Sequence, residues 1–392
     1  MLSGVLEHCN ITNPKHQITM KSQIPIFKHK GLFGILNFGH CDLFVICYLE
    51  FLETSVLHHF NIPVVNMNYT VTQETFDSLF SYWLDPENRL RWDCLFVLPS
   101  WLKVWWSVFN NGSTPYLSAV RENNRIIGIA PLMVQGEEAR FIGDPDVCDY
   151  QDFIVVPGKG EGFFEALINH LREEGIRRLD LNTVRADSKI LGEFSRVAEN
   201  LKCKISCDPE DVTYELDLPG TWDEFLGTLT GKQRHEVRRK LRRLNEAAEV
   251  NYRVVDGFNE VMDEMETFLA LFGLSRSDKA AFMTDQMAMY FRSLAETMAR
   301  ENLLKLYFLD LDGTPAAAVM CFDYDSTIYL YNNGYDGRFS SLSVGLLSKV
   351  LTIKESIRRG KKKYDFLKGT EEYKHRLGGK PVPLYRCQVR LG

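Results

Sequence analysis

A cluster of titratable side chains near the C-terminus offers the clearest chemistry in the chain. Residues 363–367 are predicted to form a strand that runs into a turn at Gly369, with a lysine, a tyrosine and carboxylates in or directly after it. A lysine can stabilise the negative charge that develops in acyl transfer, and a carboxylate can relay the proton of an attacking amine or hydroxyl. A solvated loop is the simpler alternative for any one of these side chains. We predict four catalytic residues here: Lys374, Asp365, Glu371 and Tyr373.

A second polar turn precedes a long helix that is predicted for residues 343–359. Ser340, Ser343 and Gly345 surround the start of this helix. Unpaired backbone N–H groups at a helix N-terminus bind anions, and a small residue lets a ligand approach closely, so the turn suits the pyrophosphate of a donor. An ordinary serine N-cap would have the same sequence. A Gly-rich turn at residues 157–162 contains an acidic residue that would repel a phosphate, so we expect the donor at the later turn.

A strongly basic helix is predicted for residues 231–243. Arg234, Arg238 and Arg242 form one stripe at i, i+4 spacing with few acidic partners, and such like charges destabilise a helix unless something neutralises them. The stripe can bind phosphates of a nucleotide-activated sugar, a lipid headgroup or an RNA. A solvated helix face is the plain alternative. We predict five substrate-binding residues, of which two lie in an earlier segment that lines a groove or closes a turn: Arg234, Arg238, Arg239, Asp149 and Tyr150.

The elements that position these residues are predicted to occur twice. The first copy has strands at 116–122, 125–134, 138–142 and 178–184 and a helix at 163–174. The second copy has strands at 304–309, 316–322, 327–331 and 363–367 and a helix at 343–359. A turn pair separates the first two strands of each copy, Asn123-Asn124 and Asp312-Gly313. The repetition predicts an internal duplication and a mixed α/β fold with a largely antiparallel start.

Length and composition narrow the class of protein. At 392 residues, with 45% hydrophobic and 25% charged residues, the chain has the composition of a globular protein of two domains. A formal net charge of -6 argues against general coating of nucleic acid. The nine scattered cysteines favour reduced thiols in a cytoplasm-like compartment, and we predict no metal site. Few histidines follow Met67, which leaves little material for a histidine-based triad.

The first 66 residues differ from the rest of the sequence. They hold six of the nine histidines, and their apolar stretch at 31–47 is shorter and more polar than the ~20 clean residues that span a membrane. We interpret Met67 as the start of the folded protein and residues 1–66 as a non-native or disordered extension. A membrane-associating leader is the alternative. We divide the remainder into an N-terminal domain, 67–217, and a C-terminal domain with the donor site, 218–392.

Four motifs in the second half resemble the CelD-type branch of the GNAT acyltransferase superfamily, whose relatives include the FemAB-type peptidoglycan aminoacyltransferases. The motifs are Gly-Tyr-Asp at 334–336, Ser-Val-Gly at 343–345, Tyr-Asp-Phe-Leu-Lys-Gly at 364–369 and Glu-Tyr-Lys at 372–374. The resemblance extends from about Met67 to the C-terminus. It implies two tandem GNAT-like (acyl-CoA N-acyltransferase) folds and an acyl-CoA site in the second copy, formed by Leu342, Ser343, Val344, Gly345 and Leu346.

Two positions depart from the family pattern. Thr370 stands where an acidic residue often follows the glycine of the loop, and Val344 stands where a proline often precedes the glycine of the helix start. The first departure puts a simple assignment of the general base in doubt and leaves Glu371 or the acceptor itself as candidates. The matched pair Tyr373-Lys374 implies that the lysine assists transfer.

The resemblance implies an acyltransferase that moves an acyl group, expected to be acetyl, from acyl-CoA to an amine or hydroxyl. The expected acceptor is a sugar or amine of a cell-envelope or polysaccharide precursor, and this precursor is expected to be linked to a nucleotide or a lipid. Two alternatives remain open. The first is aminoacyl transfer from charged tRNA, and the second is a non-catalytic envelope-assembly protein that binds a nucleotide-sugar or a partner. We expect a cytoplasmic location, with peripheral contact at the inner face of the membrane if the acceptor is lipid-linked.

Overall fold

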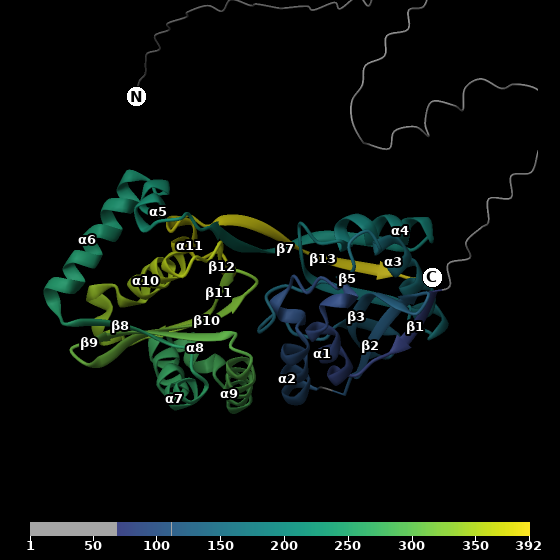
Figure 1. Ribbon diagram of the computed structural model, residues 1–392, viewed down its shortest axis with the longest axis horizontal. Coiled ribbons are helices and arrows are strands. Elements are labelled where there is room, and N and C mark those ends of the chain that lie inside the picture. Colours follow the sequence, from purple (N-terminus) through teal and green to yellow (C-terminus); the bar gives the residue numbers. More distant parts are fainter. Residues whose placement is uncertain (1–68, 111) are drawn as a thin grey trace, which may run out of the picture. The chain divides into compact units, whose positions relative to one another are not determined.

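The structure is a computed structural model that describes residues 69–110 and 112–392 (Figure 1). The predictions for residues 1–66 lie outside the described residues. The described residues belong to one compact unit. Its helices are α1 Phe76–Leu84, α2 Pro99–Phe109, α3 Gly160–Glu173, α4 Ser195–Asn200, α5 Trp222–Thr228, α6 Gly231–Ala247, α7 Phe258–Ser275, α8 Ser277–Phe282, α9 Asp285–Arg300, α10 Val344–Arg358 and α11 Glu372–Arg376.

The described strands form one mixed sheet whose order is symmetric about its centre (Figure 1). The order is β1-β2-β3-β4-β6-β13-β7-β12-β11-β10-β9-β8, and β5 pairs with β3 off this path. From either edge inward, each strand of the first copy has a counterpart in the second, so β2 matches β9 and β6 matches β12. The strands are β1 Tyr69–Gln73, β2 Thr114–Glu122, β3 Arg125–Gln135, β4 Glu138–Phe141, β5 Ile154–Val155, β6 Arg178–Arg185, β7 Lys204–Asp217, β8 Val250–Val255, β9 Leu304–Leu311, β10 Thr314–Tyr324, β11 Thr327–Tyr335, β12 Lys363–Lys368 and β13 Lys380–Arg390.

The two copies begin with the same kind of hairpin. The turn between β2 and β3 has φ 49° at Asn123 and 67° at Asn124, and the turn between β9 and β10 has φ 48° at Asp312 and 75° at Gly313. Two successive left-handed residues give a turn whose twist matches that of the flanking strands. Asparagine, aspartate and glycine tolerate this conformation best. Both predicted hairpins, and the predicted duplication, are confirmed.

Helices cover both faces of the sheet (Figure 1). On one face, α1, α2, α7 and α9 pack into a single hydrophobic core that contains residues of both copies. On the other face, α3 and α4 cover the first copy and α5, α6 and α10 cover the second, each with its own core. Trp101 of α2 joins the copies, because its ring centroid lies 5.1 Å from that of Phe322 and 5.3 Å from that of Tyr331.

The copies exchange strands at the centre of the sheet. β13 follows the second copy along the chain but pairs with β6 of the first, and β7 follows the first copy but pairs with β12 of the second. The two exchanged strands also pair with each other, with Cys207 facing Cys387. The division of the chain at residue 217 stays a prediction.

A disulfide joins Cys207 of β7 to Cys387 of β13. The prediction of reduced thiols is therefore wrong for this pair. The two cysteines are 180 residues apart in sequence, so no spacing motif indicated them. Only the unpredicted exchange of β7 and β13 brings them together. The other cysteines among the described residues are free and buried: Cys94, Cys148, Cys203 and Cys321.

The strands that follow each meander diverge in the same way. β11 and β12 are parallel partners only from Thr327 to Tyr329, although both strands continue beyond that point. β4 and β6 are likewise paired only at their first two residues. Near its C-terminal end, β6 has a bulge and a left-handed residue, Thr183 with φ 51°. β12 has the same two features, and its left-handed residue is Leu367 with φ 62°. Non-glycine residues at positive φ are strained and cluster at functional sites.

Candidate active site

A cavity of about 420 Å³ lies where β11 and β12 diverge, and we name it the C-terminal cavity. It takes Leu330 and Asn333 from β11, Leu367 from β12, and Phe272 and Lys279 from the α7–α8 region. The predicted residues Glu371, Tyr373, Lys374 and Asp149 also line it. Strand ends beside a helix N-terminus are where α/β proteins commonly place their sites. The structure thus brings three of the four predicted catalytic residues, Glu371, Tyr373 and Lys374, together in the C-terminal cavity.

Lys374 holds the turn after β12 in place. Its Nζ atom donates to the carbonyl oxygens of Leu367, Lys368 and Gly369 at 3.0, 2.5 and 3.2 Å, and it lies 2.9 Å from Oε2 of Glu371. The side chain is only 2% exposed. An ammonium group has three N–H donors, so these partners use all of them. This geometry gives Lys374 a positioning role for the turn, in addition to the charge it brings to the cavity.

Burial raises the pKa of Glu371, but the hydrogen bond and the charge of Lys374 outweigh it and hold that pKa below its ordinary value. The Glu371 side chain is half exposed and remains a carboxylate at neutral pH. Tyr373 borders both the C-terminal cavity and a smaller cavity at the start of α10. Burial raises the pKa of its hydroxyl, so Tyr373 stays protonated.

Two lysines that the sequence analysis missed complete the cluster. Lys349 of α10 is buried, and its Nζ atom donates to the carbonyl oxygen of Gly345 at 2.6 Å and to Oδ1 of Asn333 at 3.0 Å. Lys279 donates to the backbone oxygen of the same Asn333 at 2.5 Å. Burial and the neighbouring Lys279 lower the pKa of Lys349 to about 7. Burial lowers that of Lys279 to about 8.

Asp365 faces a different cavity from the other predicted catalytic residues. It is fully buried, and its Oδ2 accepts from the hydroxyl of Tyr150 at 2.6 Å while Oδ1 accepts from the backbone N–H of Leu367 at 2.8 Å. Both Asp365 and Tyr150 line a second cavity, between β6, β11 and β12. Burial raises the pKa of Asp365 to about 6, against the lowering effect of the Tyr150 hydrogen bond. The structure therefore does not bring Asp365 together with Lys374.

Asp149 and Tyr150 are neighbours in the chain but point to opposite sides. Asp149 lines the C-terminal cavity, where its Oδ2 accepts from the backbone N–H of Lys368 at 2.8 Å. Burial raises the pKa of Asp149. Tyr150 lines the second cavity. The segment closes the space between the copies, and only one of the two predicted substrate-binding residues reaches the C-terminal cavity.

The predicted donor turn forms a cavity of about 240 Å³ at the start of α10. Ser340, Ser343, Val344, Gly345 and Leu346 line it together with Lys349. No described residue accepts a hydrogen bond from the backbone N–H of Val344 or Gly345, so both donors are free for a ligand. These free donors and hydroxyls fit a pyrophosphate. A Cβ at position 345 would lie 2.7 Å from the ring of Tyr335, so packing alone already requires this glycine.

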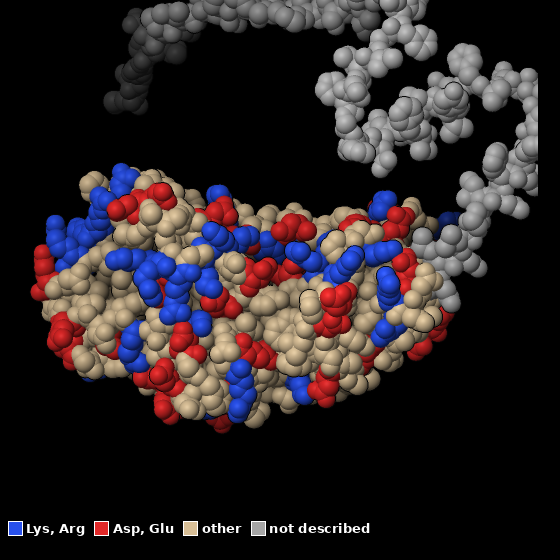
Figure 2. All heavy atoms as spheres, viewed as in Figure 1, with Lys and Arg blue, Asp and Glu red and all other residues tan. Residues whose placement is uncertain are grey.

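The basic helix α6 lies against this donor turn. Nζ of Lys240 donates to Oγ of Ser343 at 2.8 Å. Lys and Arg side chains gather over α6, at the left of the view in Figure 2. Arg239 pairs with Glu236 and Arg234 is half-buried against the Leu226 carbonyl, whereas no described carboxylate pairs with Arg238. The helix that carries the three predicted arginines thus contacts the donor turn through Lys240, and none of the three lines the C-terminal cavity or the cavity at the start of α10.

Residues 231–375 match the sequence model of the acetyltransferase (GNAT) domain family. The C-terminal part of the chain is therefore a GNAT-superfamily domain, and its class is acyltransferase, with an acyl or aminoacyl donor and an acceptor as substrates. No curated protein matches the chain.

Two solved structures resemble the whole described fold. One is FemX, with 12% sequence identity, 81% of this chain and 96% of FemX covered, and a TM-score of 0.57. The other is a conserved protein of unknown function from Bacteroides thetaiotaomicron, with 13% identity, 82% of this chain and 99% of that chain covered, and a TM-score of 0.50. At these identities the likeness shows the fold alone. It confirms two tandem GNAT-like folds.

Proposed function

We propose that the protein is an acyltransferase that moves an acyl group, acetyl in the first instance, from acyl-CoA to an amine or hydroxyl. The observation that carries the proposal is the junction at Tyr373. There, a helix start with free N–H donors meets a cavity that holds buried lysines. A donor with its pyrophosphate at Gly345 would extend its acyl end toward that junction. Lys349 lines the cavity at the start of α10 and donates to Asn333, which lines the C-terminal cavity.

In this proposal the acceptor nitrogen or oxygen attacks the thioester carbonyl carbon, the C–S bond breaks, and CoA leaves as its thiol. Tyr331 has no partner residue on β10, because the pairing shifts between Met320 and Cys321. A bulge of this kind frees backbone N–H groups that can polarise a carbonyl. Lys349, with its lowered pKa, is the group best placed to accept the acceptor's proton. Glu371 and Lys374 keep the turn that walls the cavity in place.

We propose a cell-envelope or polysaccharide precursor as acceptor, with a sugar hydroxyl or an amine as the attacking group. The family resemblance and the polar lining of the C-terminal cavity support this class. The described residues contain no helix long and apolar enough to cross a membrane. We propose a cytoplasmic site of action, with contact at the inner face of the membrane if the precursor is lipid-linked.

Aminoacyl transfer from charged tRNA is the second candidate. The basic face of α6, on which Arg238 has no described carboxylate partner, favours it, because arginines that can hold a CoA phosphate can also hold an RNA backbone. The two donors make opposite predictions. An acyl-CoA enzyme releases CoA thiol from acetyl-CoA when a suitable acceptor is present. A tRNA-dependent enzyme releases no CoA thiol with any acceptor, and its RNA binding weakens steeply at high salt. Binding of CoA without any turnover would favour a non-catalytic role.

Reversing one charge on α6 tests the proposed role of the helix. We expect Arg238→Glu to raise KM for acetyl-CoA roughly three- to tenfold and to leave kcat nearly unchanged, since a phosphate contact outside the reacting centre contributes to binding alone. The measurement is release of CoA thiol against a panel of amine and sugar acceptors. Arg196→Glu is the matched control, because Arg196 is an exposed arginine of α4 and the change in net charge is the same. Equal KM values in the two variants would remove α6 from donor binding.

A further inference from the structure

Two lysines of the candidate active site hold the same asparagine. Lys279 of α8 donates to the backbone oxygen of Asn333 at 2.5 Å, and Lys349 of α10 donates to its Oδ1 atom at 3.0 Å. Two ammonium groups on one residue repel each other, and this repulsion adds to burial in lowering the pKa of Lys349. Glu371, whose charge acts on both lysines, is already paired with Lys374 at 2.9 Å. The cluster therefore carries more positive charge than its own carboxylate balances.

Lys279 has no anion of its own. Its Nζ atom lies 4.7 Å from the ring centroid of Phe272, and among the residues that the structure describes no carboxylate lies within 4 Å of it. The neighbouring Asp278 is exposed and pairs with Arg276 at 2.9 Å. An ammonium group has three N–H donors, and Lys279 uses one of them on Asn333, so two are spare. Lys279 lines the C-terminal cavity, so these spare donors are available to a ligand there.

The side-chain amide of Asn333 offers a further donor at the same place. Lys349 holds its Oδ1 atom, which fixes the orientation of the amide, and no described residue accepts a hydrogen bond from its Nδ2 group. Asn333 also lines the C-terminal cavity. An ammonium group and an amide N–H group in one lining can each donate to one oxygen of a carboxylate. The attraction of a partly buried ammonium group to an anion is also screened less than in open water.

The other charged side chains of the C-terminal cavity are balanced or exposed. Burial raises the pKa of Asp149, and the backbone N–H and the charge of Lys368 oppose that effect. Asp146 also lines the cavity, but it is exposed to solvent. One additional negative charge therefore suits Lys279, which indicates a carboxylate rather than a doubly charged phosphate.

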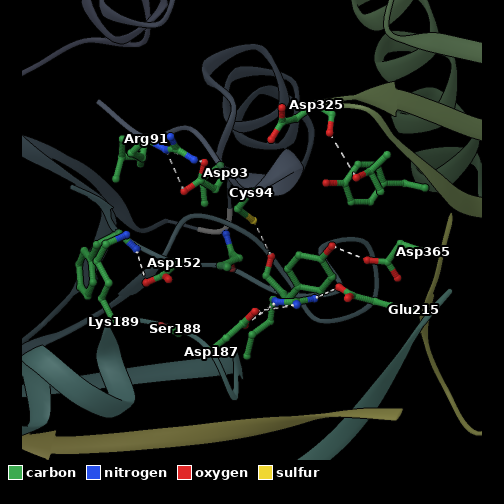
Figure 3. A pocket seen from close by; sticks show the side chains of 18 of the residues that line it. Arg91, Asp93, Cys94, Asp152, Asp187, Ser188, Lys189, Glu215, Asp325 and Asp365 are labelled. Carbon is green, nitrogen blue, oxygen red and sulfur yellow. Dashed lines mark hydrogen bonds and ion pairs between the residues drawn. The ribbon is translucent and has the colours of Figure 1, made fainter. Parts of the chain in front are cut away.

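The second cavity, between β6, β11 and β12, is unsuited to an anionic ligand. Its cations Arg185 and Lys363 pair with carboxylates of the same lining. Figure 3 shows how closely the acidic side chains of this lining gather, and they would repel an anion: Asp93, Asp152, Asp187, Glu215, Asp325 and Asp365. Of these two cavities, only the C-terminal cavity can therefore take an acceptor that carries a negative charge.

We propose that the acceptor of the acyl transfer is an amine that carries a carboxylate a few bonds away, as in an amino acid or an acidic amino sugar. Lys279 and the amide of Asn333 bind the carboxylate, and Lys349 takes the proton of the amine. Both lysines contact Asn333, so the two groups of the acceptor lie close together. Lys279 determines specificity and takes no part in bond making. This inference rests on the proposed acyltransferase function and narrows its acceptor to one class, in which neutral sugars are poor substrates.

Matched pairs of acceptors test this class on the full chain. L-Alanine is compared with L-alaninamide, and muramic acid with glucosamine, because the members of each pair share the amine and differ in the carboxylate. Release of CoA thiol from acetyl-CoA gives kcat and KM for each acceptor. We expect the carboxylate member of at least one pair to have a kcat/KM at least about tenfold higher, which is the usual effect of one hydrogen bond to a charged group.

Substitutions of Lys279 separate carboxylate binding from a structural role. Lys279→Gln removes the charge and keeps a donor for the Asn333 oxygen. It should raise KM for the carboxylate member about tenfold and leave both kcat and the uncharged member nearly unchanged. Lys279→Arg keeps the charge and should retain most of the preference. Lys204→Gln is the matched control, since Lys204 is exposed on β7 and lines neither the C-terminal cavity nor the cavity at the start of α10.

Three results would overturn the inference and leave the acyltransferase function intact. They are equal kcat/KM values within both pairs, an equal loss for both members of a pair in Lys279→Gln, and a carboxylate preference that Lys279→Gln does not reduce. Melting curves show whether each variant is folded. If Lys279→Gln does not fold, the acceptor pairs with the wild-type chain decide the question by themselves.

The absence of CoA thiol release with every acceptor would instead contradict the proposed function. Calorimetric titration of the same acceptors in the presence of CoA then tests the carboxylate site separately. Binding of a carboxylate member that Lys279→Gln weakens would support the site. No binding, or binding that the variant does not weaken, would overturn it.

Discussion

Replacing Lys349 with methionine is expected to lower kcat for acyl transfer about a hundredfold at pH 8, which is the usual contribution of a general base. Lys349 is buried at the junction of the two cavities and has only two hydrogen-bond partners, so one N–H position is spare. Its pKa of about 7 leaves the amine mostly neutral at this pH. Lys354→Met, on the exposed side of the same helix, is the matched control and should retain activity. A normal kcat in Lys349→Met would remove Lys349 from the mechanism.

The same lysine predicts a pH dependence with a definite sign. Catalysis by the neutral amine should rise as the pH increases through about 7 and then level off. Stability should change in the same direction. An unfolded lysine titrates near 10.4, so between about pH 7 and 10 the unfolded chain binds more protons than the folded chain, and the free energy of unfolding increases with pH. Lys279 adds to this slope because its pKa is about 8. Of the other groups near Lys349, Glu371 raises its pKa and Lys374 lowers it.

Melting curves at pH 7 and pH 9 measure the effect of pH on stability separately from its effect on catalysis. The wild-type chain should gain stability between these values, and Lys349→Met should lose most of that gain. A wild-type melting temperature that falls over this interval would contradict the buried, proton-poor state of Lys349 and Lys279.

Replacing Lys374 with methionine is expected to reduce the free energy of unfolding by about 3 kcal/mol, in the range found when one partner of a buried charged pair is removed. The change removes the ammonium donor from three carbonyl oxygens of the 367–369 turn and the cation beside Glu371. The left-handed Leu367 in this turn is strained and needs such support. The acyltransferase activity should fall together with the stability, because the turn forms part of the wall of the C-terminal cavity.

Urea unfolding measures this loss, and Lys380→Met is its matched control. Lys380 forms an exposed pair with Asp217, and such pairs contribute ~0–1 kcal/mol. If the Lys374→Met variant is as stable as the Lys380→Met variant, the turn does not depend on Lys374. A stable but inactive Lys374→Met would assign the lysine to the reaction itself.

Local patterns predicted the duplicated elements well. The turns at Asn123-Asn124 and Asp312-Gly313 lie where the sequence placed them, because few residue types tolerate two successive left-handed conformations. The α10 helix was expected at 343–359 and forms at Val344–Arg358, followed by Gly360 with φ 72°. The order of elements in each copy, and with it the fold class, depends on such local rules.

The parts that the sequence did not predict depend on contacts between distant segments. The exchange of β7 and β13 joins residues about 180 positions apart, and no local pattern encodes it. Asp365 lines the second cavity beside Glu215 of β7, which that exchange brings next to β12. Lys349 had a detectable signal. It lies within the apolar stripe of Leu346, Val350 and Ile353, and a lysine on the buried side of a helix is unusual.

Calorimetric titration of acetyl-CoA into the chain tests most directly whether the start of α10 is an acyl-donor site. Ser340 lines the donor cavity, whereas the adjacent Ser341 is equally exposed but does not line it. We predict binding in the range of 1 μM to 1 mM that is typical of enzyme substrates, retained in Ser341→Glu and weakened at least about tenfold in Ser340→Glu. No binding to the wild-type chain, or equal binding to both variants, would contradict the assignment of the donor site.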